Sequence, residues 1–96
     1  MDAFDALEQV QDMDTLFAFV RALIQDRQSA VAAELKNPSS PYGPDAGGWE
    51  NVTIDQYLCA ALAWAERTSM GATQGIAELN TWRAFASFLY VGKIHE

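Results

Sequence analysis

The hydrophobic positions along this chain recur at helical spacing, and no stretch alternates between apolar and polar residues as a half-buried strand would. The pattern predicts a short first helix over residues 2 to about 9, with acidic side chains on one side and apolar side chains on the other. A second helix is expected from residue 12 or 14 to about residue 36. It ends before Pro38, because a residue that precedes proline is pushed out of the helical region.

Two further helices are predicted in the second half of the chain. Thr53, followed three residues later by Gln56, has the spacing of a capping box and marks the start of the third helix. Asn80 is a favourable N-cap residue and marks the start of the fourth. The fourth helix is apolar nearly all round, and such a helix is normally buried on every side. We therefore expect the first helix and a second copy of the chain to cover it, with Phe88 and Val91 at a homodimer interface.

The second and third helices each carry an arc of apolar positions that we expect to face the core. In the second helix these positions are Leu16, Phe17, Phe19, Val20, Leu23, Ile24, Val31 and Leu35. In the third helix they are Ile54, Tyr57, Leu58, Ala61, Leu62, Trp64 and Ala65. Arg27 falls near the centre of the first arc. An unpaired buried arginine is costly, so either the helix bends there or Arg27 pairs with Asp26, Glu34 or Glu50.

A long loop over residues 37–51 contains all three prolines of the chain and three of its six glycines. Tyr42 and Trp49 give this loop apolar anchors, so we expect it to be ordered. Two interpretations stay open: a rigid strap that closes one end of the core, or a recognition loop for a partner. Trp49, Trp64 and Trp82 are expected to share one aromatic core.

Together these elements predict an all-α fold. The expected architecture is a compact bundle of three main helices plus a short N-terminal helix, with the long Pro/Gly-rich loop between the second and third helices. The chain has 96 residues, of which half are hydrophobic, and this length fits a single helical domain over residues 1–96.

Charge and composition narrow the classes of protein to which the chain can belong. Thirteen acidic residues against six basic ones give a net charge of -7, which argues against binding to nucleic acid or to an anionic membrane. The longest apolar run, residues 57–65, is too short to cross a bilayer, and the acidic start does not look like a secretory signal. We therefore expect a cytoplasmic protein.

The residues that carry most enzyme chemistry are scarce. Cys59 and His95 are the only cysteine and the only histidine, and a nucleophilic pair needs a thiolate with a base within hydrogen-bonding reach. Cys59 has acidic neighbours on its helix, which do not favour a thiolate, and His95 lies next to the C-terminus. The sequence also lacks an EF-hand loop, a pair of histidine ligands and a glycine-rich phosphate loop. We predict no catalytic residue, no metal, no cofactor and no enzymatic activity.

Several segments resemble a family of small acidic bacterial proteins of unknown function. They are Pro41-Tyr42-Gly43-Pro44, Gly48-Trp49-Glu50-Asn51, Ala60-Ala61-Leu62-Ala63-Trp64-Ala65-Glu66, Trp82-Arg83-Ala84-Phe85-Ala86, Phe88-Leu89-Tyr90 and Gly92-Lys93-Ile94. The resemblance extends from about Val10 to the end of the chain. It implies a small helical cytoplasmic domain with no established activity, so no catalytic residue carries over. Cys59 and His95 depart from the family pattern, which often has an acidic residue and an aromatic residue at these two positions.

The function that we predict is a non-enzymatic protein-interaction module. Its sharpest form is an immunity-type or inhibitor protein that binds a basic partner, because a surplus of negative charge speeds encounter with a cationic protein. The alternatives are a self-associating structural domain and, last, a small enzyme. The candidate partner-binding residues are Tyr42, Asp45, Trp49, Glu50, Asp55, Asp2, Asp5, Glu8 and Asp12.

Overall fold

The computed structural model describes residues 2–40, 44, 47–75 and 81–95, and this part of the chain is helical without any strand. The elements in chain order are α1 (Ala3–Glu8), α2 (Met13–Lys36), α3 (Ile54–Thr68), the short 3₁₀ helix η1 (Ala72–Gln74) and α5 (Thr81–Ile94). The all-α prediction of three main helices plus a short N-terminal helix is confirmed. The predictions that concern Tyr42, Asp45 and the N-cap residue Asn80 lie outside the described residues.

Side-chain caps define where the two longest helices begin. At the start of α2 the Thr15 backbone N–H donates to Asp12 Oδ1 at 2.9 Å, and the Asp12 backbone N–H donates to Thr15 Oγ1 at 3.0 Å. This reciprocal pair satisfies two backbone donors that the helix itself leaves unpaired. At the start of α3, Thr53 Oγ1 accepts from the Gln56 backbone N–H at 3.3 Å, at the position that its spacing predicts.

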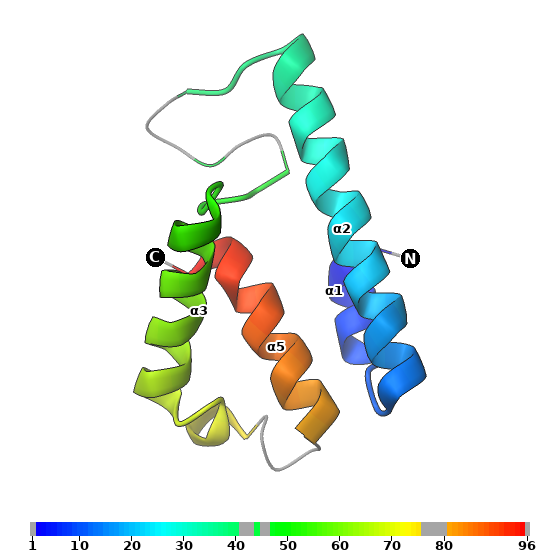
Figure 1. Cartoon of the computed structure of the whole chain (residues 1–96), viewed down its shortest axis with the longest axis vertical. Coiled ribbons are helices and arrows are strands. Elements are labelled where there is room, and N and C mark those ends of the chain that lie inside the picture. Colours follow the sequence, from blue (N-terminus) through cyan, green and yellow to red (C-terminus); the bar gives the residue numbers. More distant parts are fainter. Residues whose placement is uncertain (1, 41–43, 45–46, 76–80, 96) are drawn as a thin grey trace.

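Helix α5 lies between α2 and α3 (Figure 1). It packs most extensively on α3, and α1 lies behind α2 and contacts both α2 and α5. Among the described residues, α2 and α3 make no contact with each other. The core is therefore built around α5, and the two longest helices, α2 and α3, stand on either side of it.

The most deeply buried large side chains are Phe19 of α2 and Val10, which lies between α1 and α2. Tyr90 of α5 completes this centre, with its ring 6.5 Å from that of Phe19. Trp64 of α3 is also buried, and its indole N–H donates to Gln74 Oε1 of η1 at 3.2 Å. The expectation for Trp82 was wrong. Its side chain is 41% exposed in the first turn of α5, so the three tryptophans do not share one core.

The apolar arcs of α2 and α3 are only partly buried, which corrects the expectation that both arcs face the core. The positions that remain exposed are Phe17, Ile24, Val31, Leu35, Ile54, Leu58 and Leu62. The physical reason is the separation of the two helices. Each arc is wider than the strip that α5 and α1 cover, and α2 and α3 do not cover each other.

Candidate functional site

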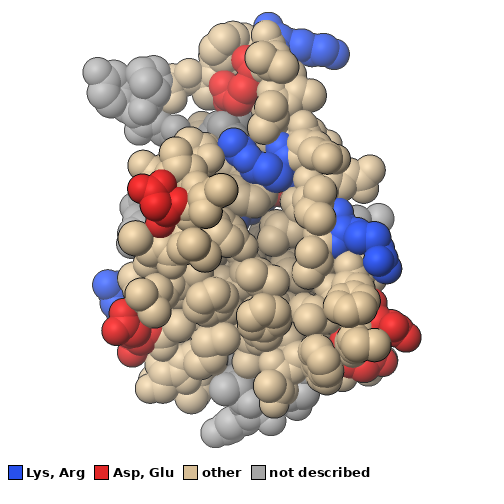
Figure 2. All heavy atoms as spheres, in the orientation of Figure 1, with Lys and Arg blue, Asp and Glu red and all other residues tan. Residues whose placement is uncertain are grey.

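An apolar groove of about 520 Å³ lies between α2 and α3, and α5 contributes Leu89 to it. We call it the interhelical groove. Its other lining residues are Val20, Leu23, Ile24, Arg27, Gln28, Trp49, Asn51, Val52, Thr53, Ile54, Tyr57 and Leu58. Figure 2 shows the side of the molecule on which it opens, here called the groove face. Uncharged side chains form the centre of this face, and most charged side chains lie around it.

The α2 wall of the groove comes from a helix with two apolar stripes. One stripe, which includes Leu16, Phe19 and Leu23, is buried in the core. The second recurs at spacings of three and four residues and is exposed or only partly buried. Its members are Met13, Phe17, Val20, Ile24, Val31 and Leu35. Ile24, in the middle of this stripe, is 52% exposed.

The α3 wall is a ridge of three apolar residues spaced four apart. They are Ile54, Leu58 and Leu62, and their exposed fractions are 81%, 52% and 54%. The opposite side of α3 is buried against α5 and η1, where Ala61, Trp64 and Thr68 lie. Residues four apart lie one above another on a helix, so the ridge runs along the edge of the groove.

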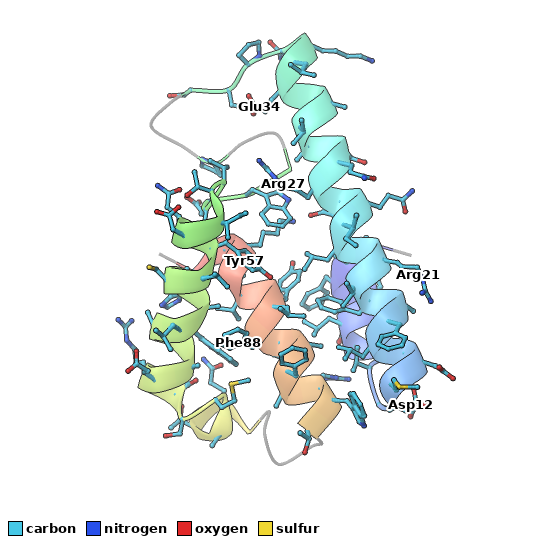
Figure 3. The ribbon with its side chains drawn as sticks, viewed as in Figure 1. Asp12, Arg21, Arg27, Glu34, Tyr57 and Phe88 are labelled. Carbon is cyan, nitrogen blue, oxygen red and sulfur yellow. The ribbon has the colours of Figure 1, made fainter. Side chains whose placement is uncertain are left out.

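Charged side chains of opposite sign flank the two walls. The middle of α2 carries Arg21 and Arg27, and Figure 3 shows Arg27 at the level of the groove and Arg21 on the outer side of the helix. On α3, Asp55 and Glu66 flank the apolar ridge, each within a quarter turn of it. A hydrogen bond with the Thr53 side chain is the largest of the interactions that lower the pKa of Asp55. The α2 rim is thus basic in its middle, and the α3 rim is acidic.

Trp49 closes one end of the groove. Only 6% of it is exposed, and its indole N–H donates to Asp26 Oδ2 at 3.0 Å. Two cations face the same ring, with the Arg27 guanidinium 5.2 Å and Lys93 Nζ 5.4 Å from its centroid. Cations over an aromatic face are attracted by its negative π-cloud. The half-buried Arg27 side chain thus lies against an aromatic ring, a partner that the sequence did not predict beside Asp26, Glu34 and Glu50.

Asn51 ties the same segment to the C-terminal end of α5. Its Nδ2 donates to the carbonyl oxygens of Gly92 at 3.0 Å and His95 at 2.7 Å, and the Glu50 backbone N–H donates to Lys93 O at 2.9 Å. Asn51 thus satisfies carbonyl oxygens that the end of α5 leaves unpaired. Residues 47–52 thus tie the start of α3 to α2 and α5, and we call this segment the strap.

The acidic candidate residues do not form one patch. Asp2, Asp5 and Glu8 are exposed on or next to α1, which makes no contact with α3 in the described structure. Asp12 caps α2 at the same end of the chain, and its hydrogen bond with the Thr15 side chain lowers the pKa of its carboxyl group. The other described acids among the candidates, Glu50 and Asp55, are exposed at the start of α3. Tyr42 and Asp45 are outside the described residues.

The residues considered for catalysis lie apart from the groove. Cys59 is exposed on α3, and His95 follows the last turn of α5. Within the described ranges, no group of three or more His, Cys, Asp or Glu side chains is placed to hold a metal ion. In the same part of the chain, no helix has the length and apolar character needed to cross a membrane.

The chain belongs to the family of unknown function DUF7660, whose model matches residues 12–96. The matched region contains α2, α3 and α5, and hence both walls of the interhelical groove and the Trp49 strap. No curated protein and no solved structure matches this chain.

Proposed function

We propose that this member of family DUF7660 is a non-enzymatic protein-interaction module that binds through its interhelical groove. One observation carries the proposal: Val20 and Ile24 of the α2 stripe face Ile54 and Leu58 of the α3 ridge across one groove, and Ile24, Ile54 and Leu58 are exposed. Contiguous exposed apolar surface beyond a few hundred Å² is uncommon on monomeric proteins and marks sites of association. Apolar residues at helical spacing favour a helix or a helical pair as the bound element.

The polar groups that line the groove favour a protein partner over a small polar substrate. The Tyr57 hydroxyl donates to the Leu89 carbonyl oxygen, Thr53 caps α3, and Asn51 caps α5. Burial raises the pKa of the Tyr57 hydroxyl, which keeps it in its neutral, donating form. A site that binds a small molecule usually presents several convergent polar groups for its ligand. Here these three groups are already engaged within the fold.

A basic partner is a second candidate, favoured by α1. The charged residues at this helix are Asp2, Asp5 and Glu8, and all three are exposed. Their position behind α2 would allow a cationic protein to bind without entering the groove. An immunity-type or inhibitor role belongs to this candidate. Its contacts would weaken as salt screens the charges.

Affinity capture with matched variants tests the proposal. Tagged wild-type protein, Ile24→Glu and Ile94→Glu would be used as baits in lysate that also contains an untagged copy, and the captured chains quantified by mass spectrometry. Ile94 is 44% exposed and lies five residues after Leu89, on the other side of α5 from the groove. We expect Ile24→Glu to lose captured chains that Ile94→Glu retains. Equal capture by all three baits would contradict binding through the groove.

The α1 candidate needs a different variant. A bait with Asp2, Asp5 and Glu8 replaced by lysine should lose a basic partner, and moderate salt should release the same partner from the wild-type bait. Retention of every captured chain by this bait would reject the acidic surface as a binding site. Circular dichroism of each bait shows whether its helices have formed.

A further inference from the structure

We infer that the occupant of the interhelical groove is a second copy of this chain, in a face-to-face homodimer. In this dimer α2 of each copy packs against α3 of the other. The inference rests on the proposed function, since it requires the groove face to be the interaction surface, and it goes further by naming the partner. Three independent features of the described residues support it: the exposed area, the charges on the two rims, and the distribution of charge between the two faces.

The exposed apolar area is sufficient for a stable dimer. The large apolar side chains of α2, of α3 and at position 52 that remain exposed have exposed fractions between 43% and 83%. They are Met13, Phe17, Ile24, Val31, Leu35, Val52, Ile54, Leu58 and Leu62. Taking about 180 Å² for each side chain when fully exposed, they present roughly 900 Å² per copy. A specific interface of standard size buries about 800 Å² on each partner. Ile24, Val52, Ile54 and Leu58 line the groove itself, and together with the other exposed side chains of the two helices they provide the area that an interface of this size requires.

The rims of the groove are complementary to each other. Arg21 flanks the α2 stripe, and Asp55 and Glu66 flank the α3 ridge. In a two-fold dimer that pairs α2 with α3, the basic rim meets the acidic rim twice. Pairing α2 with α2 along the full stripe would instead bring arginines of the two copies together. A basic helix in the groove would meet Arg27, which lines the groove and carries the same sign of charge. The charges therefore favour a second copy over a basic segment.

The distribution of charge allows two copies of net charge -7 to approach by this face. The acids at α1 lie behind α2 in the view of Figure 1, which looks down the shortest axis of the molecule. Along that axis the Cα atoms extend over 18 Å. This exceeds the Debye length of about 8 Å at physiological ionic strength. Face-to-face packing keeps Asp2, Asp5 and Glu8 of the two copies on opposite outer surfaces, where solvent screens their repulsion.

The fold can accept this arrangement without rearrangement. Helices α2 and α3 run in opposite directions on the groove face (Figure 1). A two-fold axis parallel to them lays α2 of one copy on α3 of the other, and the four helices form an antiparallel bundle. The Phe88 ring, predicted at a dimer interface, lies in front of α5 in Figure 3 and stacks on Phe85 at 6.4 Å. Phe88 can therefore contact the partner at the floor of this interface. Val91 is half-buried, one turn further along the helix.

Sedimentation equilibrium over a range of protein concentrations tests the dimer. Wild-type protein should approach twice the chain mass of 10.6 kDa as the concentration rises. Ile24→Glu should stay at the monomer mass, because a carboxylate would be buried against the partner's apolar ridge. Ile94→Glu is the matched control and should behave as the wild type. Far-ultraviolet circular dichroism and thermal unfolding of both variants separate loss of the dimer from loss of the fold.

Charge reversal tests the proposed pairing of α2 with α3. Arg21→Glu and Glu66→Arg should each weaken the homodimer by about tenfold, because each puts like charges opposite one another at both rims. An equimolar mixture of the two variants should associate as tightly as the wild type, since opposite charges then face each other again. If the mixture associates no better than either variant alone, the pairing of α2 with α3 is overturned.

The outcomes also separate the dimer from the proposed function. A wild-type protein that is monomeric at every concentration overturns the dimer. If Ile24→Glu nevertheless loses a captured partner in the lysate experiment, the groove binds a different chain and the proposed function stands. If the protein is monomeric and Ile24→Glu captures the same chains as the wild type, both proposals fall.

Discussion

Lys93 Nζ donates a hydrogen bond to Asp26 Oδ2 at 2.8 Å, and this ion pair joins the last turn of α5 to the middle of α2. The lysine side chain is only 10% exposed, which is unusual for this residue type. The Trp49 indole N–H donates to the same carboxylate oxygen. One carboxylate thus holds α2, α5 and the strap together at the end of the interhelical groove.

Removing this carboxylate should destabilise the fold. Asp26→Ala would leave the Lys93 ammonium buried without a counter-charge and the Trp49 indole N–H without its acceptor. We expect the free energy of unfolding to fall by about 3 kcal/mol, the lower end of the range for a broken buried pair, because the Asp26 side chain is 28% exposed. Urea denaturation followed by circular dichroism measures this change.

The double variant Asp26→Leu with Lys93→Met is the control for that measurement. It removes both charges and keeps apolar volume, so it should be closer in stability to the wild type than Asp26→Ala is. If the double variant is less stable than Asp26→Ala, the Asp26–Lys93 ion pair itself stabilises the fold, beyond preventing an unpaired buried charge. That result would contradict this interpretation.

The tryptophans provide a second prediction, in which burial decides the cost. Trp64→Ala should lower the free energy of unfolding by about 3–5 kcal/mol, since Trp64 is 5% exposed and its indole N–H is hydrogen-bonded. Trp82→Ala should cost less, about 1 kcal/mol, because 41% of Trp82 is already exposed. Equal losses in chemical denaturation would show that Trp82 is covered in solution.

The fold could be predicted from the sequence where local rules decide. Capping residues such as Asp12 and Thr53 and the proline after α2 act on the nearest few residues, so they locate helix ends without knowledge of the partners. The width of an apolar arc does not say how much of it is covered. That depends on which helices touch, and the separation of α2 from α3 is a property of the assembled chain.

The strap was only partly predictable, because its burial follows from residue type while its partners are distant in the sequence. The apolar character of Trp49 indicated burial, which is confirmed. Its partners Asp26 and Lys93 lie 23 and 44 residues away, and no local pattern connects them. Lys93 in particular looked like an ordinary basic residue at the end of a helix, where a cation complements the helix dipole.

A third prediction concerns the close approach of α3 and α5. A Cβ atom at Gly92 would lie 2.7 Å from Tyr57 Cε1, well inside van der Waals contact. Gly92→Ala should therefore lower the free energy of unfolding by about 1–3 kcal/mol, as overpacking does. Combining it with Tyr57→Leu removes the ring, so the double variant should cost less than the sum of the two single changes. If the losses of stability from the two single changes add strictly in thermal unfolding, α3 and α5 move apart freely to accept the extra methyl group.

The fourth prediction concerns the pH dependence of the unfolding free energy that Asp12 contributes at the start of α2. The hydrogen bonds from the Thr15 side chain and backbone lower the pKa of Asp12 below its ordinary value of 3.8. A lowered pKa gives stability that is present above the ordinary value and is lost as pH falls through the folded value. The difference in unfolding free energy between the wild type and Asp12→Asn should therefore narrow as the solution is acidified below pH 3.8.

Thr15→Val supplies the check on that mechanism. Without the hydroxyl group the pKa of Asp12 should return toward its ordinary value, so the acid dependence should become weaker. An unchanged acid dependence in Thr15→Val would mean that another group is responsible.

The central claim is that the groove face meets a second copy of the chain. Isotope-filtered nuclear Overhauser spectroscopy on an equal mixture of labelled and unlabelled protein tests it without any substitution, because it detects only contacts between copies. We predict contacts from the Ile24 methyl groups of one copy to the Leu58 and Leu62 methyl groups of the other. Contacts confined to α1, or no contact between copies at high micromolar concentration, would contradict the claim.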